Sequence, residues 1–152
     1  MSQKLQKLLA DPGYAGIYHL PHGDRKALQR ATKALAFGWL EADLGEEREI
    51  AYVLERIGSQ LKLPDWYGAN YDALSDCLSD LSWQGAWQDS RGYVMLLKGA
   101  DELHAHDHPA FETLNEVLSG VIDTWRQEGI PFWVFYDLRA DGLATMPTIA
   151  TA

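Results

Sequence analysis

The stretch that decides the fold runs from Leu61 to Trp83 and reads LKLPDWYGANYDALSDCLSDLSW. Pro64 and Gly68 interrupt regular secondary structure, so a loop is expected over residues 64–69. Asn70 is a favourable N-cap, and a helix is expected directly behind it. Residues that recur at helical spacing mark the buried face of this helix: Tyr71, Leu74, Cys77, Leu78 and Leu81.

The other face of the predicted helix carries three carboxylates, Asp72, Asp76 and Asp80, each four residues apart. Residues at i and i+4 lie one above the other on a helix, so the acids are expected to form one stripe. Like charges at this spacing repel by roughly 0.2–0.5 kcal/mol per pair, and Asp is a poor helix former. No Lys or Arg occurs between Lys62 and Arg91 to offset the repulsion. A broken local rule of this kind can indicate a functional surface, but a run of charges is more commonly a solvated helix face, and composition alone favours the solvated face.

The motif L-P-x-W-Y-G-x-N-x-D-A-L-x-D-C-L within this stretch resembles the signature of the barstar family, intracellular protein inhibitors of a secreted bacterial ribonuclease. The order of predicted elements from about residue 36 to residue 136 also fits that family. The resemblance implies an α/β, barstar-like fold, with a small parallel β-sheet packed with helices. Residues 1–35 lie outside it as an extension, expected to add one βα unit to a single domain spanning residues 1–152.

In the barstar family this helix and the preceding loop plug the active site of the nuclease. By resemblance, Asp72 and Asp76 would meet the basic residues that hold RNA phosphate, with Asp76 as the main phosphate mimic. The full set of partner-binding residues implied is Trp66, Tyr67, Asn70, Tyr71, Asp72, Ser75, Asp76 and Glu128. Two positions depart from the family pattern, because Ser75 replaces a tryptophan and Thr124 replaces a glutamate. These departures bear on which nuclease is the target.

The composition of the chain is that of one globular domain, with 152 residues of which 47% are hydrophobic. Its net charge of −9 disfavours direct nucleic-acid or anionic-membrane binding and favours a cationic partner, although plain solubility also explains it. A basic extracellular-type ribonuclease or an RNase toxin domain is such a partner. We expect a cytoplasmic protein, because no signal peptide is recognisable and no apolar run approaches the ~20 residues of a membrane span.

Cysteine and histidine are the remaining candidates for chemistry. Cys77, the single cysteine, suits a reducing compartment and is expected to be a small buried hydrophobe rather than a reactive thiol. The three histidines of His104–His108 suggest a metal-dependent hydrolase as an alternative function, or else a polar loop before a helix that starts at Pro109. No nucleophile–base pair or phosphate-binding glycine-rich loop is visible, so we assign no catalytic residue, metal or cofactor and expect a non-enzyme. A barstar-fold module for a non-nuclease partner is the third alternative.

Hydrophobic periodicity predicts the other elements. Helices are expected at residues 2–10, 25–35, from 46 to 61 and 109–128, and strands at 17–20, 37–44, 93–97 and 132–136. The succession from residue 17 to 44 indicates a βαβ unit that adds one parallel strand to the sheet. In the connection over residues 82–92, Trp83 and Trp87 either extend the contact surface or pack at the core rim. About residues 138–152 are expected to be a loose tail.

Overall fold

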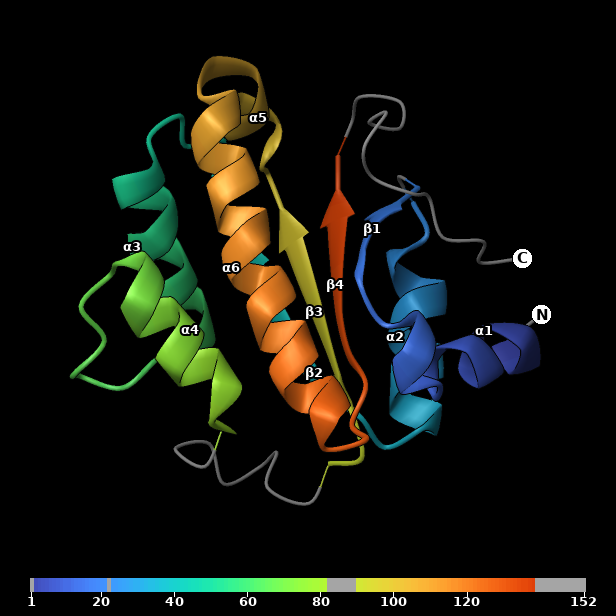
Figure 1. Cartoon of the computed structure of the whole chain (residues 1–152). Helices are drawn as coiled ribbons and strands as arrows, with labels where there is room; N and C mark the ends of the chain where they lie inside the picture. Colours follow the sequence, from blue (N-terminus) through green and yellow to red (C-terminus); the bar gives the residue numbers. More distant parts are fainter. Residues whose placement is uncertain (1, 22, 82–89, 139–152) are drawn as a thin grey trace.

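The structure is a computed structural model that describes residues 2–21, 23–81 and 90–138 (Figure 1). Its strands are β1 (Ile17–Leu20), β2 (Gly38–Asp43), β3 (Tyr93–Lys98) and β4 (Phe132–Asp137). Its α-helices are α1 (Ser2–Leu9), α2 (Arg25–Ala34), α3 (Ile50–Leu61), α4 (Tyr71–Ser79), α5 (Asp101–His106) and α6 (His108–Gln127). A short 3-10 helix, η1, covers Pro12–Tyr14.

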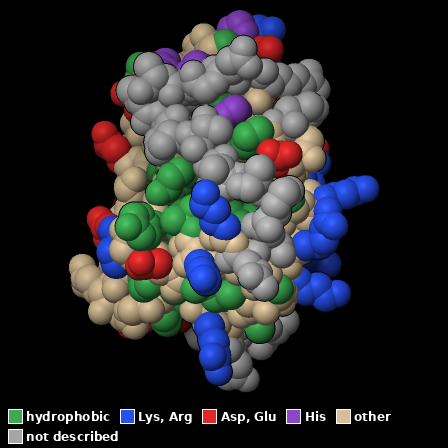
Figure 2. Space-filling view, turned by 90° about the vertical axis from the view of Figure 1, so that its right-hand side faces the viewer, with side chains coloured by type: hydrophobic (Ala, Val, Ile, Leu, Met, Phe, Trp, Pro, Cys, Tyr) green, Lys and Arg blue, Asp and Glu red, His purple; other side chains and the backbone are tan. Residues whose placement is uncertain are grey.

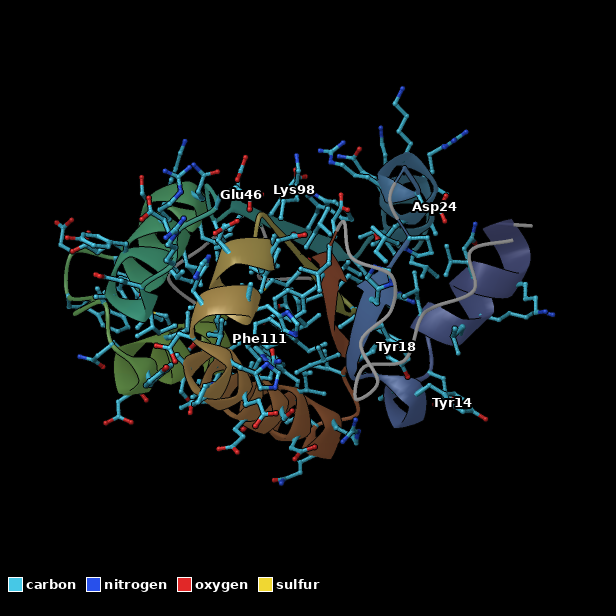
Figure 3. The ribbon with its side chains drawn as sticks, turned by 90° about the horizontal axis from the view of Figure 1, so that it is seen from above. Tyr14, Tyr18, Asp24, Glu46, Lys98 and Phe111 are labelled. Atoms are coloured by element: carbon cyan, nitrogen blue, oxygen red, sulfur yellow. The ribbon has the colours of Figure 1, made fainter. Side chains whose placement is uncertain are left out.

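The four strands form one parallel sheet in the order β1-β4-β3-β2. Strands β3 and β4 occupy its centre, and each is buried over its first five residues, because both sequences are unbroken apolar runs. Helix α6 lies along one face of the sheet and α2 lies on the other (Figures 1 and 3). This arrangement confirms the expected α/β fold.

The N-terminal extension supplies the fourth strand, as predicted. Strand β1 pairs in parallel with β4, with Ile17 opposite Val134. Strands β1 and β2 are not neighbours, however, because β4 and β3 lie between them. The indole N–H of Trp133 in β4 donates to the carbonyl of Leu9 at 2.8 Å, and Leu9 is fully buried. The extension therefore shares one hydrophobic core with the rest of the chain.

Two sequence-based expectations outside the motif are wrong. The helix expected to begin at the glutamates 46–49 begins at Ile50, because Gly45 and Glu46 both have positive φ (+65° and +60°) and form a turn instead. The polar loop expected at His104–His108 is almost entirely helical. Asp107 alone separates α5 from α6, and its carboxylate accepts the backbone N–H of Ala110 at 3.2 Å as the N-cap of α6.

Two other expectations lie wholly or mostly outside the described residues. Trp83 and Trp87 belong to the segment 82–89, and the expected tail lies beyond Leu138, which is itself buried. None of the helices in the described part of the chain combines the length and hydropathy of a membrane span.

Candidate functional site

The candidate site begins where α3 ends. Lys62 adopts a left-handed conformation with φ of +55°, which stops the helix. The backbone N–H of Leu63 then donates to the carbonyl of Gly58 at 2.9 Å. This turn directs the chain into the loop that precedes α4, whose second bend is closed by the N–H of Tyr67 donating to the carbonyl of Pro64 at 2.9 Å.

Tyr67 fixes this loop to α3. Its hydroxyl donates to the carbonyl of Leu54 at 2.8 Å. Its ring lies so close to Gly58 that a Cβ added there would be 2.6 Å from Cε2 of the ring. Burial raises the pKa of the Tyr67 hydroxyl, so it remains a protonated donor. Tyr67, which the resemblance implies as a partner-binding residue, is half-buried and positions the loop.

Asn70 starts α4 as predicted. Its backbone is extended, and its side-chain carbonyl accepts the backbone N–H of Ala73 at 2.8 Å. Asp72 follows in the first turn, where a carboxylate is stabilised by the helix dipole. The exposed Asn70 thus has a defined structural role, independent of any partner.

The inner face of α4 packs against α6. Its fully buried side chains are Leu74, Cys77 and Leu78. Near its C-terminus, the indole N–H of Trp125 in α6 donates to the carbonyl of Leu78 at 2.9 Å. At its N-terminus, the hydroxyl of Tyr71 lies 3.5 Å from the carbonyl of Ala110. Both ends of α4 are therefore held by α6, which makes the helix a rigid support.

Cys77 behaves as the buried hydrophobe that the sequence predicts. Its side chain has no solvent exposure. Burial raises the pKa of the thiol, and the nearby carboxylate of Asp76 raises it further. The reactive thiolate is therefore disfavoured at neutral pH.

The outer face of α4 presents Asp72 and Asp76 to solvent. Within the described part of the chain, neither carboxylate forms an ion pair or accepts a side-chain hydrogen bond. Asp80 does not continue the stripe, contrary to expectation, because α4 ends at Ser79 and Asp80 has extended backbone angles. A carboxylate at a helix C-terminus is repelled by the negative end of the dipole, which accounts for the early end. Half-buried Ser75 lies beside the remaining pair.

The two residues predicted at the edges of this surface are both exposed. Trp66, in the loop before α4, has 62% of its surface exposed. Glu128 is the C-cap residue of α6, three residues beyond the Trp125 that contacts the end of α4. Thr124, which stands in place of a glutamate, donates its hydroxyl to the carbonyl of Gly120 at 3.0 Å. That side chain supplies no charge to a partner.

We define the α4 surface as Trp66, Asp72, Ser75, Asp76 and Glu128. It lines neither of two surface cavities found elsewhere: one of about 650 Å³ between β1 and α6, and a smaller one before α3. An exposed helix with two carboxylates one turn apart, about 5–6 Å between Cβ atoms, suits insertion into a concave cationic partner.

The sequence analysis did not predict that the side chain of Tyr67 points inward. A signal for it was present, because Gly58 inside a predicted helix indicates the close approach of another group.

The histidines of α5 and α6 contact different partners. His106 Nε2 lies 2.9 Å from a carboxylate oxygen of Glu102, and His108 Nε2 lies 2.9 Å from one of Glu112. Among the residues that the structure describes, no group of three or more His, Cys, Asp or Glu side chains is placed to hold a metal ion.

Comparison with known proteins gives one family match. The family described as Barstar (barnase inhibitor) matches residues 37–137, close to the boundaries expected from the motif. No curated protein matches the chain significantly. Among solved structures, a chain in "Structure of Drosophila ORC bound to DNA" is similar, with a TM-score of 0.57 and 16% identity. The match covers 97% of this chain and 40% of the other, and at this identity the likeness concerns the fold alone.

Proposed function

Because the chain belongs to the Barstar (barnase inhibitor) family, we propose that it inhibits a ribonuclease by inserting the α4 surface into a basic active site. The family is one of inhibitors rather than enzymes. The observation that carries the proposal is the pair Asp72 and Asp76. Both carboxylates are exposed and unpaired within the described chain, on a helix that α6 holds near both ends.

The proposed mechanism is steric and electrostatic. A ribonuclease holds the phosphate of RNA with cationic side chains, and a carboxylate offers those cations the same acceptor chemistry. Asp76, in the middle of α4, would replace the phosphate, and Asp72 would make a second contact one turn earlier. Since α4 and its loop are already fixed in the free protein, little conformational entropy is lost on binding.

The remaining residues of the site divide into contacts and supports. Trp66 supplies exposed aromatic area, and Trp is enriched at the energetically important centres of interfaces. Ser75 and Glu128 add polar contacts beside the two acids. Tyr67 and Asn70 act through position, because the Tyr67 hydroxyl donates to the carbonyl of Leu54 and the Asn70 side-chain carbonyl accepts the N–H of Ala73. In a cell, such an inhibitor would serve as a cytoplasmic immunity protein against an RNase toxin domain.

The test is inhibition of two basic ribonucleases, barnase and any nuclease encoded beside this gene. We expect stoichiometric inhibition of at least one of them in a fluorogenic RNA cleavage assay. Asp76→Asn should weaken this inhibition strongly, whereas Glu116→Gln on α6 removes the same charge from an exposed carboxylate away from the α4 surface and should leave it intact. Failure to inhibit either nuclease, or equal effects of the two substitutions, would contradict the proposal.

A further inference from the structure

The net charge of −9 is the sum of two unlike parts of the chain. Residues 1–35 contain six Lys or Arg and two Asp, a net charge of +4. Residues 36–152 contain seven Lys or Arg and twenty Asp or Glu, a net charge of −13. The N-terminal extension is therefore a cationic segment on an otherwise strongly anionic protein, and such asymmetry suggests an anionic ligand for the extension.

Most of these cations are available to a ligand. The exposed ones, which we call the basic face, are Lys4, Lys7, Lys26, Arg30 and Lys33. Within the described residues none of the five forms an ion pair. The sixth cation, Arg25, differs because it binds the carboxylate of Glu41 at 2.6 Å and lies over the ring of Trp39. Arg25 thus supports the fold. Of the other five, Arg30 Nε donates to the carbonyl of Lys26 in its own helix at 3.3 Å, and no acidic side chain among the described residues neutralises any of the five.

The fold brings the five side chains to one end of the molecule. Lys26, Arg30 and Lys33 follow the i, i+4, i+7 spacing of one helix face and extend over about 10 Å along α2. Helix α1, which carries Lys4 and Lys7, packs against α2. In the view onto this side of the molecule, Lys and Arg side chains gather at the centre and along the right-hand edge (Figure 2).

The basic face has no apolar anchor. The exposed large hydrophobic side chains of the described chain are Tyr14, Tyr52 and Trp66, none of which belongs to α1 or α2. The larger apolar side chains of these two helices face inward: Leu5, Leu9 and Leu28 are buried in the core, and Leu8 is half-buried against it. Insertion into a lipid interface and binding of an apolar peptide both require exposed apolar area. A row of cations alone is instead complementary to a chain of regularly spaced phosphates.

We propose that the basic face binds the sugar–phosphate backbone of nucleic acid without reading its base sequence. Contacts of Lys and Arg with phosphate position a protein on a strand but carry no sequence information. The acidic remainder of the chain repels the same polyanion, which restricts binding to this end. The α4 surface lies on the opposite side of the molecule, so the two surfaces do not compete (Figures 1 and 3). The proposal does not depend on ribonuclease inhibition.

The experiment measures binding of the full chain to a fluorescein-labelled 20-nucleotide oligouridine by anisotropy at several salt concentrations. If all five cations contact phosphate, log K should fall against log salt with a slope of about −3.5, from ~0.7 per contact. The triple variant Lys26→Gln, Arg30→Gln, Lys33→Gln leaves two contacts and should bring the slope to about −1.4, with binding at least about tenfold weaker at low salt. Gln is as good a helix former as Lys or Arg, so the melting temperature should not change.

The matched control is Arg48→Gln, Lys62→Gln, Arg91→Gln, which removes three exposed cations outside the extension. It changes the net charge equally and should leave the slope near the wild-type value. Equal losses in the two triple variants would overturn the proposal, because binding would then follow net charge. Absence of RNA binding by the wild-type chain at low salt would also overturn it, as would binding to phosphatidylserine vesicles in place of RNA. No nuclease is present, so failure here leaves the proposed inhibition untouched.

Discussion

Replacing Asp76 by Ala separates binding from folding most directly. In the free protein the carboxylate is exposed and forms no ion pair among the described residues, so its removal breaks no salt bridge. Ala is the better helix former by about 0.6 kcal/mol, and repulsion from Asp72 at i−4 disappears, worth roughly 0.2–0.5 kcal/mol. Only one such repulsion counts, because Asp80 lies outside the helix. We therefore expect a gain of about 0.8–1.1 kcal/mol in the free energy of unfolding.

The same substitution should weaken inhibition severely. Truncating one partner of a buried, hydrogen-bonded charge pair costs about 2–5 kcal/mol, which corresponds to at least roughly 30-fold in the inhibition constant. Urea unfolding of the free chain and titration of the nuclease measure the two effects independently. A melting temperature well below the wild-type value would show that Asp76 serves the fold. Unchanged inhibition would show that Asp76 is not the residue that replaces phosphate, and either result would refute the mechanism.

The other predictions concern the support of the site and its electrostatics. Gly58→Ala should destabilise the protein by about 1 kcal/mol or more and weaken inhibition, since the added Cβ would lie 2.6 Å from the ring of Tyr67. Gly120→Ala is the control: apart from adjoining residues and its own helix backbone, nothing lies within 4 Å of the added Cβ, so urea titrations should show α6 stabilised by up to about 1 kcal/mol. Folding raises the pKa of the Cys77 thiol, so the folded state favours the protonated form. The stability that this preference adds should be complete below the ordinary thiol pKa of about 9, and it should be lost as pH rises through the higher pKa of the folded protein. Unfolding curves of Cys77→Ala should accordingly show a weaker decline above pH 9, and an identical decline would argue against a protected thiol. Association with a basic nuclease should slow steeply with ionic strength in stopped-flow experiments, because exposed charges are screened within about 10 Å at 0.1 M salt. A rate independent of salt would eliminate electrostatic steering.

Local chemistry in the sequence determined the elements with clear signals. Asn70 specifies the start of α4, because its short side chain satisfies a backbone N–H that no helical carbonyl can reach. The unbroken apolar runs at residues 93–97 and 132–136 predicted the two central strands, since they are short, rich in aromatic and β-branched residues, and suited to a strand covered on both faces. The motif likewise predicted the family to which the chain belongs, and the order of elements predicted the boundaries of the matched segment, residues 37–137, within a few residues.

Tertiary structure decided which partners these elements meet, because pairing between distant segments depends on packing that no local pattern encodes. Strand β1 lies beside β4 rather than β2, although β2 is its neighbour in the sequence. Tyr67 turns inward because Gly58 leaves space on α3 for its ring and the carbonyl of Leu54 accepts its hydroxyl. Asp80 leaves the acidic stripe because α4 ends one residue earlier. The acidic pair is thus a property of the sequence, whereas its rigidity and its separation from the basic face come from the fold.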